Sequence, residues 1–310
     1  MTTNIIHLSD LHIDESDREA DNLSIIVESI VKYDWANGKP AILITGDMVN
    51  DGKKEQFKKV RAILDPLYRN SFTMLPVPGN HDYGWRGNHA EAKRFKHFKS
   101  AFYFKENISY PQVKEINNHT FIGLNSMKAE TGFFDGLLAD GELGQKQLGN
   151  LAGILKKCDN RSPGEKVILF IHHHPFLYPD ESGLKTFFEK TGHWLKDGDE
   201  FMEHIKGKVD ILLFGHEHRH LDFSQTDISL QYEIPLILSA SQCTQYAKEF
   251  AVDQDGCADK DIILAKGLLG SLVTINDCGN IRKNTIRFDK KNGLEFVSKY
   301  KEELENNPPV

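Results

Sequence analysis

Residue types that bind metals occur in five clusters, each placed directly after a short apolar run that predicts a β-strand. The clusters are Asp10-Leu11-His12, Gly46-Asp47, Gly79-Asn80-His81-Asp82, His172-His173-His174-Pro175 and Gly215-His216-Glu217-His218. Taken singly, each has an ordinary explanation as a helix cap, a turn or an exposed histidine run. Catalytic groups in α/β proteins collect at the carboxyl ends of strands, so five clusters in this position predict one shared site.

The donor set indicates the chemistry that such a site could perform. Imidazole and carboxylate together suit zinc, manganese and iron, and no cysteine joins the clusters, which disfavours a structural thiolate zinc site. Only two of the candidate ligands are carboxylates, Asp10 and Asp47. Two divalent ions bridged by a hydroxide would then leave a net positive charge, which attracts an anion such as phosphate. Asn80 fits as a neutral oxygen ligand that preserves this charge, and paired ions suit an in-line displacement.

The elements that must position these clusters alternate along the chain. Strands are expected at residues 4–8, 41–45, 72–77, 120–124, 167–171, 209–214, 234–238, 269–275 and 281–288. Helical spacing of apolar residues predicts helices around Leu23 to Val31, Phe57 to Leu64 and Phe95 to Phe102, and a further helix from about Gly141 capped by Asp140. This order predicts an α/β fold in which two mixed β-sheets pack on each other and helices flank them.

In this order the motifs Asp-x-His, Gly-Asp, Gly-Asn-His-Asp, His-His-Pro and Gly-His-x-His resemble the signature of calcineurin-like metallophosphoesterases. They span residues 10–218, and the C-terminal strands fit the rest of that αββα sandwich. The resemblance implies a hydrolase of phosphate esters that holds two metal ions (manganese, iron, zinc or cobalt) and uses a metal-bridging hydroxide as nucleophile. The sequence is similar to the cyclic-nucleotide phosphodiesterase branch, because the third motif ends in Asp82. This implies a small phosphodiester substrate.

The resemblance also implies a role for each matching residue. The metal ligands would be Asp10, His12 and His218 for the first ion, Asn80, His173 and His216 for the second, and Asp47 as the bridge between them. His81 would not bind metal but would contact the substrate phosphate and assist the leaving group as an acid or hydrogen-bond donor. Asp82 would orient His81.

The choice of ligand within the histidine run remains open at this point. Alignment on His-His-Pro makes His173 the ligand. If the strand at residues 167–171 continues, His172 and His174 share the opposite face from His173, and His172 is the alternative.

Composition and net charge help to compare the alternative functions of this protein. Hydrophobic residues make up 39% and charged residues 27% of the 310 residues, as in ordinary globular proteins, and the net charge is −7. A nuclease would need a basic groove, and this charge disfavours nucleic acid as a partner. A phosphomonoesterase or phosphoprotein phosphatase is the closer alternative. A non-catalytic scaffold is disfavoured, because every ligand position and His81 are present.

The remaining expectations concern organisation and surroundings. Residues 1–298 are expected to form one domain, with a candidate lid at 176–200, a second candidate substrate-selecting segment at 246–266 and a polar tail at 299–310. Arg86 is a weaker candidate for binding a non-reacting phosphate oxygen, His89, His193 and Trp194 are weaker candidates for the mouth of the site, and His220 is expected to be exposed. With neither a signal peptide nor an apolar run long enough to span a bilayer, we expect a cytoplasmic protein that does not bind membranes. The oligomeric state is not predicted.

Overall fold

The computed structural model describes six stretches of the chain, namely residues 2–84, 91–103, 108–127, 140–176, 195–247 and 267–297. The phosphate-binding candidate Arg86 and the candidate mouth residues His89, His193 and Trp194 lie outside these ranges. So do the tail, the greater part of the candidate lid, and all but the first two residues of the segment 246–266.

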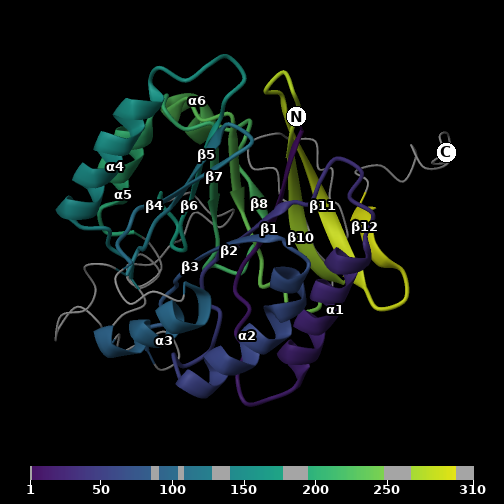
Figure 1. Ribbon diagram of the computed structural model, residues 1–310. Helices are drawn as coiled ribbons and strands as arrows, with labels where there is room; N and C mark the ends of the chain where they lie inside the picture. Colours follow the sequence, from purple (N-terminus) through teal and green to yellow (C-terminus); the bar gives the residue numbers. More distant parts are fainter. Residues whose placement is uncertain are drawn as a thin grey trace.

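Two six-stranded sheets form the centre of the molecule (Figure 1). The first has the order β12-β11-β10-β1-β2-β3, with β1 (Thr3–Leu8), β2 (Ala41–Thr45), β3 (Thr73–Val77), β10 (Leu268–Ile275), β11 (Ile281–Asp289) and β12 (Gly293–Val297). The second has the order β4-β5-β6-β7-β9-β8, with β4 (Gln112–Ile116), β5 (His119–Gly123), β6 (Val167–Phe170), β7 (Ile211–Phe214), β8 (Leu221–Asp222) and β9 (Leu236–Ser239).

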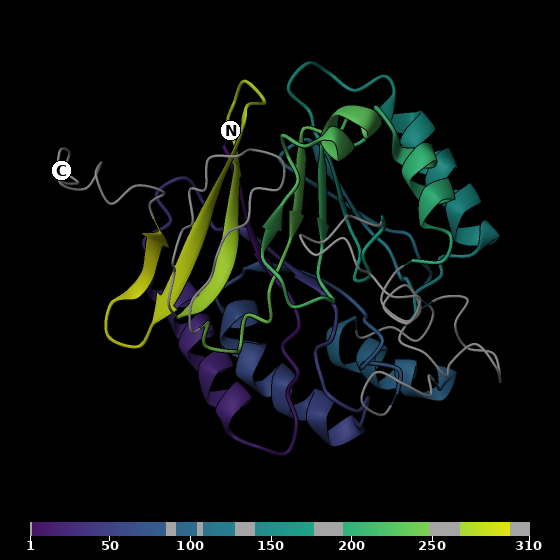
Figure 2. The ribbon, with the colours of Figure 1, turned by 180° about the vertical axis from the view of Figure 1, so that it is seen from behind.

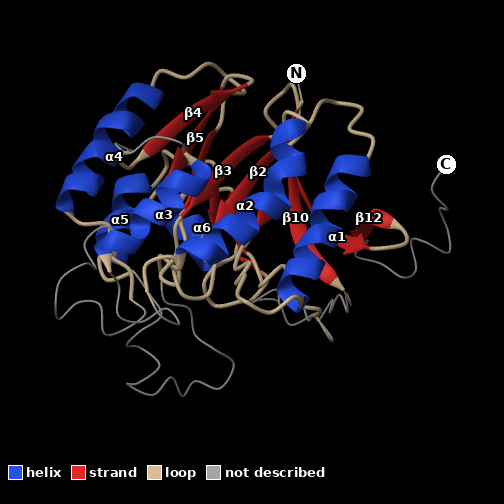
Figure 3. Cartoon of the chain, turned by 60° about the horizontal axis from the view of Figure 1, so that its bottom comes forward, coloured by secondary structure: helices blue, strands red, loops and turns tan. Residues whose placement is uncertain are grey.

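Helices cover the outer face of each sheet. On the first sheet lie α1 (Arg18–Lys32), α2 (Lys54–Arg69) and α3 (Ala92–Phe102), and on the second lie α4 (Gln145–Cys158), α5 (Gly198–Ile205) and α6 (Asp227–Tyr232). Figure 3 shows α1, α2 and α3 in front of the strands of the first sheet. The same layers appear from behind in Figure 2. The predicted α/β fold of two packed mixed sheets flanked by helices is therefore confirmed.

Strand side chains alternate between an outer core under the helices and an inner core between the sheets. In β2, Ile42 and Ile44 pack under the helices, whereas Leu43 faces the second sheet. In β6, Leu169 faces outward and Ile168 faces the first sheet. Because both faces are covered, these strands read as continuous apolar runs, and this is why the sequence identified them.

Some boundaries differ from the sequence predictions. Helix α4 begins at Gln145, not near Gly141, and Asp140 does not cap it. The carboxylate of Asp197 instead accepts the N–H groups of Leu143 and Gly144 just before the helix. Helix α5 begins inside the range predicted as a lid. No helix in the described ranges combines the length and apolar character needed to cross a bilayer.

The candidate metal centre

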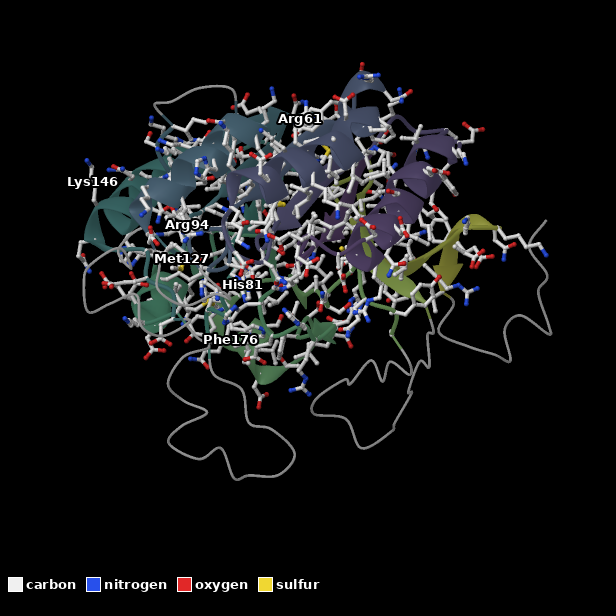
Figure 4. The ribbon with its side chains drawn as sticks, turned by 90° about the horizontal axis from the view of Figure 1, so that it is seen from below. Arg61, His81, Arg94, Met127, Lys146 and Phe176 are labelled. Carbon is white, nitrogen blue, oxygen red and sulfur yellow. The ribbon has the colours of Figure 1, made fainter. Side chains whose placement is uncertain are left out.

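The five sequence clusters converge at the carboxyl ends of strands from both sheets. Asp10 and His12 follow β1, Asp47 follows β2, and Asn80 and His81 follow β3. From the second sheet, the histidine run follows β6 and the pair His216 and His218 follows β7. Figure 4 looks at the molecule from below and shows the labelled His81 between Arg94 and Phe176.

One group of donors combines the first and last motifs. The Nε2 atoms of His12 and His218 lie 2.9 Å apart, and Asp10 Oδ1 lies 3.5 Å from His218 Nε2. Asp10 is fully buried, and among the described residues its Oδ1 atom meets no hydrogen-bond partner. A buried carboxylate oxygen left without a donor is costly, so a cation at this point would satisfy it.

A second group gathers around Asn80. The Nε2 atom of His172 lies 2.9 Å from Asn80 Oδ1 and 3.1 Å from His216 Nδ1. Asp47 lies between the two groups, because its Oδ2 atom is 3.3 Å from His172 Nε2 and 3.7 Å from His12 Nε2. This placement suits a carboxylate that bridges two ions.

The geometry favours His172 over His173 as the ligand from the histidine run. The Nδ1 atom of His172 donates to the carbonyl of Thr45 at 2.7 Å, which leaves Nε2 directed at Asn80 and Asp47. His173 instead bonds through Nδ1 to the hydroxyl of Ser126 at 2.6 Å, and its ring lies 4.4 Å from that of His216. We therefore propose His172 as the ligand in place of His173. His173 still lies close enough to His172 and His216 to belong to the wall of the site.

The loops that carry the ligands have unusual backbone conformations. Positive φ angles between 47° and 77° occur at five predicted ligands: Asp10, His12, Asp47, His216 and His218. Such residues cost roughly 1–3 kcal/mol each, and they persist where the surroundings determine the conformation, typically at functional sites. These five residues follow β1, β2 and β7, so the backbone turns sharply at the ends of those three strands.

Two glycines in the motifs are required by close packing. A Cβ atom on Gly46, whose φ is +90°, would lie 2.4 Å from His172 Nδ1. A Cβ atom on Gly79 would lie 2.2 Å from Asp47 Oδ1. The glycines that accompany Asp47 and Asn80 in the sequence therefore allow the ligands to approach one another.

Burial and charge act against each other in this site. Burial opposes ionisation of Asp47, but the charges of His172 and the neighbouring histidines outweigh it and hold the pKa of this carboxyl well below its usual value. Burial likewise disfavours the charged form of His172, yet Asp47 and Asp10 raise its pKa to about 9. Burial lowers the pKa of His12 to about 4, so this imidazole is neutral and ready to bind a metal.

Asp82 makes contacts other than the one predicted for it. Its carboxyl oxygens accept the backbone N–H groups of Gly79 and Val49, at 2.9 and 3.3 Å, and make no hydrogen bond to His81. Burial and the charge of Asp47 raise the pKa of Asp82 well above its usual value. The Nδ1 atom of His81 bonds instead to the carbonyl of Asn50 at 2.9 Å. Asp82 thus holds the loop together, and Asn50 orients His81.

Asn50 is the residue that sequence reasoning missed. Its side-chain Oδ1 lies 3.1 Å from His12 Nδ1, while its backbone carbonyl contacts His81. An oxygen on Nδ1 directs the opposite nitrogen of His12 toward the other ligands. Its position three residues after Asp47 was a signal that could have been used. His220 also departs from expectation, because it is buried and lies 3.3 Å from the Thr285 hydroxyl.

Two layers of β-sheet with an Asp, Asn and His site at their shared edge define a metal-dependent phosphoesterase. The family model described as calcineurin-like phosphoesterase matches residues 3–220, and the chain belongs to this family.

Curated relatives of this chain carry phosphodiesterase names. A probable glycerophosphodiester phosphodiesterase GpdQ from Arcobacter nitrofigilis is 27% identical over 258 residues, which cover 80% of this chain and 82% of that protein. A probable cyclic nucleotide phosphodiesterase from Vesicomyosocius okutanii is 23% identical and covers 74% of this chain and 84% of its own length.

Solved structures share the fold at much lower identity. Purple acid phosphatase PPD1 from yellow lupin has a TM-score of 0.59 and 12% identity, and the match covers 94% of this chain and 52% of that one. The chain therefore spans about half the length of that phosphatase. GAP50, the anchor in the inner membrane complex of Plasmodium, has a TM-score of 0.57 and 10% identity. The match covers 96% of this chain and 89% of that one.

Proposed function

We propose that this protein hydrolyses small phosphodiesters at a dinuclear metal centre. The observation that carries the proposal is the position of Asp47 Oδ2 between two sets of donors, 3.7 Å from His12 Nε2 and 3.3 Å from His172 Nε2. Asp10, His12 and His218 would hold one ion, and Asn80, His172 and His216 the other. Two ions bound here would activate water and neutralise the charge of the reacting phosphate.

His81 is the residue that would act on the leaving group. Its Nδ1 is occupied by the Asn50 carbonyl, so Nε2 is the nitrogen available to a substrate. The rings of His12 and His81 lie 4.5 Å apart at right angles, which places His81 beside the first group of ligands without a hydrogen bond from its ring to them. Because Nδ1 already gives its hydrogen to the Asn50 carbonyl, Nε2 would donate a proton or a hydrogen bond to the departing oxygen from the doubly protonated, imidazolium form of the ring.

The diester preference rests on the names of the relatives at 23% and 27% identity. Their names differ in substrate, one a glycerophosphodiester and the other a cyclic nucleotide. What the two substrates share is a small phosphodiester, and this is the class that we propose.

The test is the hydrolysis of bis(p-nitrophenyl) phosphate beside p-nitrophenyl phosphate by chelated protein, with manganese, iron, zinc or cobalt restored. Cyclic nucleotides and glycerophosphocholine are then compared as natural diesters. Metal-dependent turnover of the diesters supports the proposal, and the Asp47→Asn variant should lose both ions and the activity. Turnover of the monoester alone would indicate a phosphomonoesterase. No turnover with any restored metal would contradict the proposal.

A further inference from the structure

The carbonyl that orients His81 belongs to a peptide group with a second, fixed contact. The carbonyl of Asn50 accepts from His81 Nδ1 at 2.9 Å, and the N–H of the same peptide, on Asp51, donates to Gln56 Oε1 at 3.0 Å. A peptide group is planar and rigid, so a contact at its N–H fixes the direction of its C=O. Gln56 and His81 therefore contact the two ends of one rigid peptide group.

Gln56 is well placed to hold this peptide. It lies in the first turn of α2, only 2% of its surface is exposed, and its Nε2 also donates to Asp51 Oδ2 at 3.0 Å. The side-chain amide of Gln56 thus forms hydrogen bonds with both the backbone N–H and the carboxylate of Asp51. The position of Gln56 is fixed by the packing of its helix, because α2 contributes Phe57, Val60 and Leu64 to the core.

The neighbouring groups of the same loop are held as well. The N–H of Asn50 donates to the carbonyl of Ile13 at 3.2 Å, and Arg94 of α3 donates to the carbonyl of Asp51. Arg94 also pairs with Glu91 at 3.2 Å. Three elements, the loop after β1 and helices α2 and α3, therefore hold the short segment whose carbonyl contacts His81.

We propose that Gln56 is a positioning residue for His81, acting through the peptide that joins Asn50 to Asp51, with Arg94 as a second support. This inference rests on the proposed function of His81 as the donor to the leaving group. It predicts that loosening the peptide impairs proton donation by His81, and assays at saturating metal separate this effect from any change at His12, which the Asn50 side chain contacts. The effect should therefore depend on how much the leaving group needs a proton.

The test compares two diesters with the same methyl group and different leaving groups, methyl p-nitrophenyl phosphate and methyl phenyl phosphate. In Gln56→Met, we expect kcat for the phenyl ester to fall roughly 10-fold to 100-fold, because phenolate is the more basic leaving group and misplaced catalytic groups cost this much. The kcat for the p-nitrophenyl ester should fall less than about threefold, with KM within about twofold and both metals retained.

A paired substitution tests the contact itself. Gln56→Glu alone places a carboxylate against that of Asp51, whereas Gln56→Glu combined with Asp51→Asn exchanges the two groups and restores a donor and an acceptor. The double variant should recover the phenyl ester activity that the single variant loses. Arg94→Met should show the same dependence on the leaving group. This variant tests the role of the peptide between Asn50 and Asp51 if Gln56→Met does not fold. Arg61→Met, an arginine of α2 that pairs with Asp65, is the matched control.

Equal losses for the two esters, or no loss in a folded variant with both metals, would overturn the role of Gln56. A wild-type protein that hydrolyses neither ester with any metal would instead overturn the proposed function. Metal content and the thermal unfolding midpoint of each variant are measured alongside the kinetics, so these two failures are distinguishable.

Discussion

At the scale of single residues, the sharpest question is which histidine of the run binds metal. His172 Nε2 faces Asn80 and Asp47, whereas His173 Nδ1 bonds to Ser126. We expect His172→Asn to lose an ion of the Asn80 group and nearly all activity, and His173→Asn to keep both ions. Metal content by plasma mass spectrometry after gel filtration decides this. The reverse pattern would restore His173 as the ligand.

Asn50 permits a second prediction at this scale, because its side chain and its carbonyl serve different histidines. Asn50→Ala removes the contact with His12 Nδ1 and keeps the carbonyl that contacts His81. Loss of a residue that orients a metal ligand typically weakens metal affinity 10-fold to 100-fold, and we expect this for one of the two ions. Competition with a fluorescent chelator measures it. Unchanged affinity for both ions would show that His12 needs no such support.

At the scale of elements, the tight contact between Asp47 and the turn after β3 is open to a direct test. A Cβ atom on Gly79 would lie 2.2 Å from Asp47 Oδ1 and 2.8 Å from His172 Cδ2. Gly79→Ala should displace both side chains, reduce the affinity for both metals and destabilise the fold by about 1–3 kcal/mol.

The matched control for this substitution is Gly149→Ala in α4, where a Cβ atom meets nothing within 4 Å. It should stabilise the protein by about 0.4–1 kcal/mol, because alanine favours the helix and restricts the unfolded chain. Denaturant unfolding and metal titration compare the two variants. Normal metal binding by Gly79→Ala would mean that this turn has room to shift.

The elements also show what sequence reasoning could reach. Buried strands such as β2 were predictable, because both faces are covered and the sequence is continuously apolar. Edge strand β4 was not, because the sequence of Gln112–Ile116 carries a lysine and a glutamate on a strand with a solvated face. In the site, the motifs identified the clusters. The choice of His172 depends on the Thr45 carbonyl, which comes from a strand 127 residues away, and such long-range contacts leave no local pattern.

At the scale of the whole molecule, the site joins the two sheets, so metal binding should stabilise the fold as a unit. Asp10, His12, Asp47 and Asn80 come from the first sheet, whereas His172, His216 and His218 come from the second. A ligand that binds only the folded state stabilises it by about 2.7 kcal/mol at 100 times its dissociation constant. Chelation should therefore lower the unfolding midpoint, and manganese should restore it. The Asp47→Asn variant should respond to neither.

Metal binding should depend on pH, because it releases protons from the ligands. In the metal-free folded protein the pKa of His172 is raised to about 9, so this imidazole is protonated at pH 7.5. A histidine must be neutral to bind a metal, so binding displaces this proton below pH 9 and the apparent metal affinity rises as the pH approaches that value.

Calorimetry in buffers of different ionisation enthalpy counts the protons released. We expect the count to fall by about one between pH 7.5 and 10. A count that does not change over this interval would mean that His172 is already neutral, and its proposed pairing with Asp47 before the metal binds would be wrong.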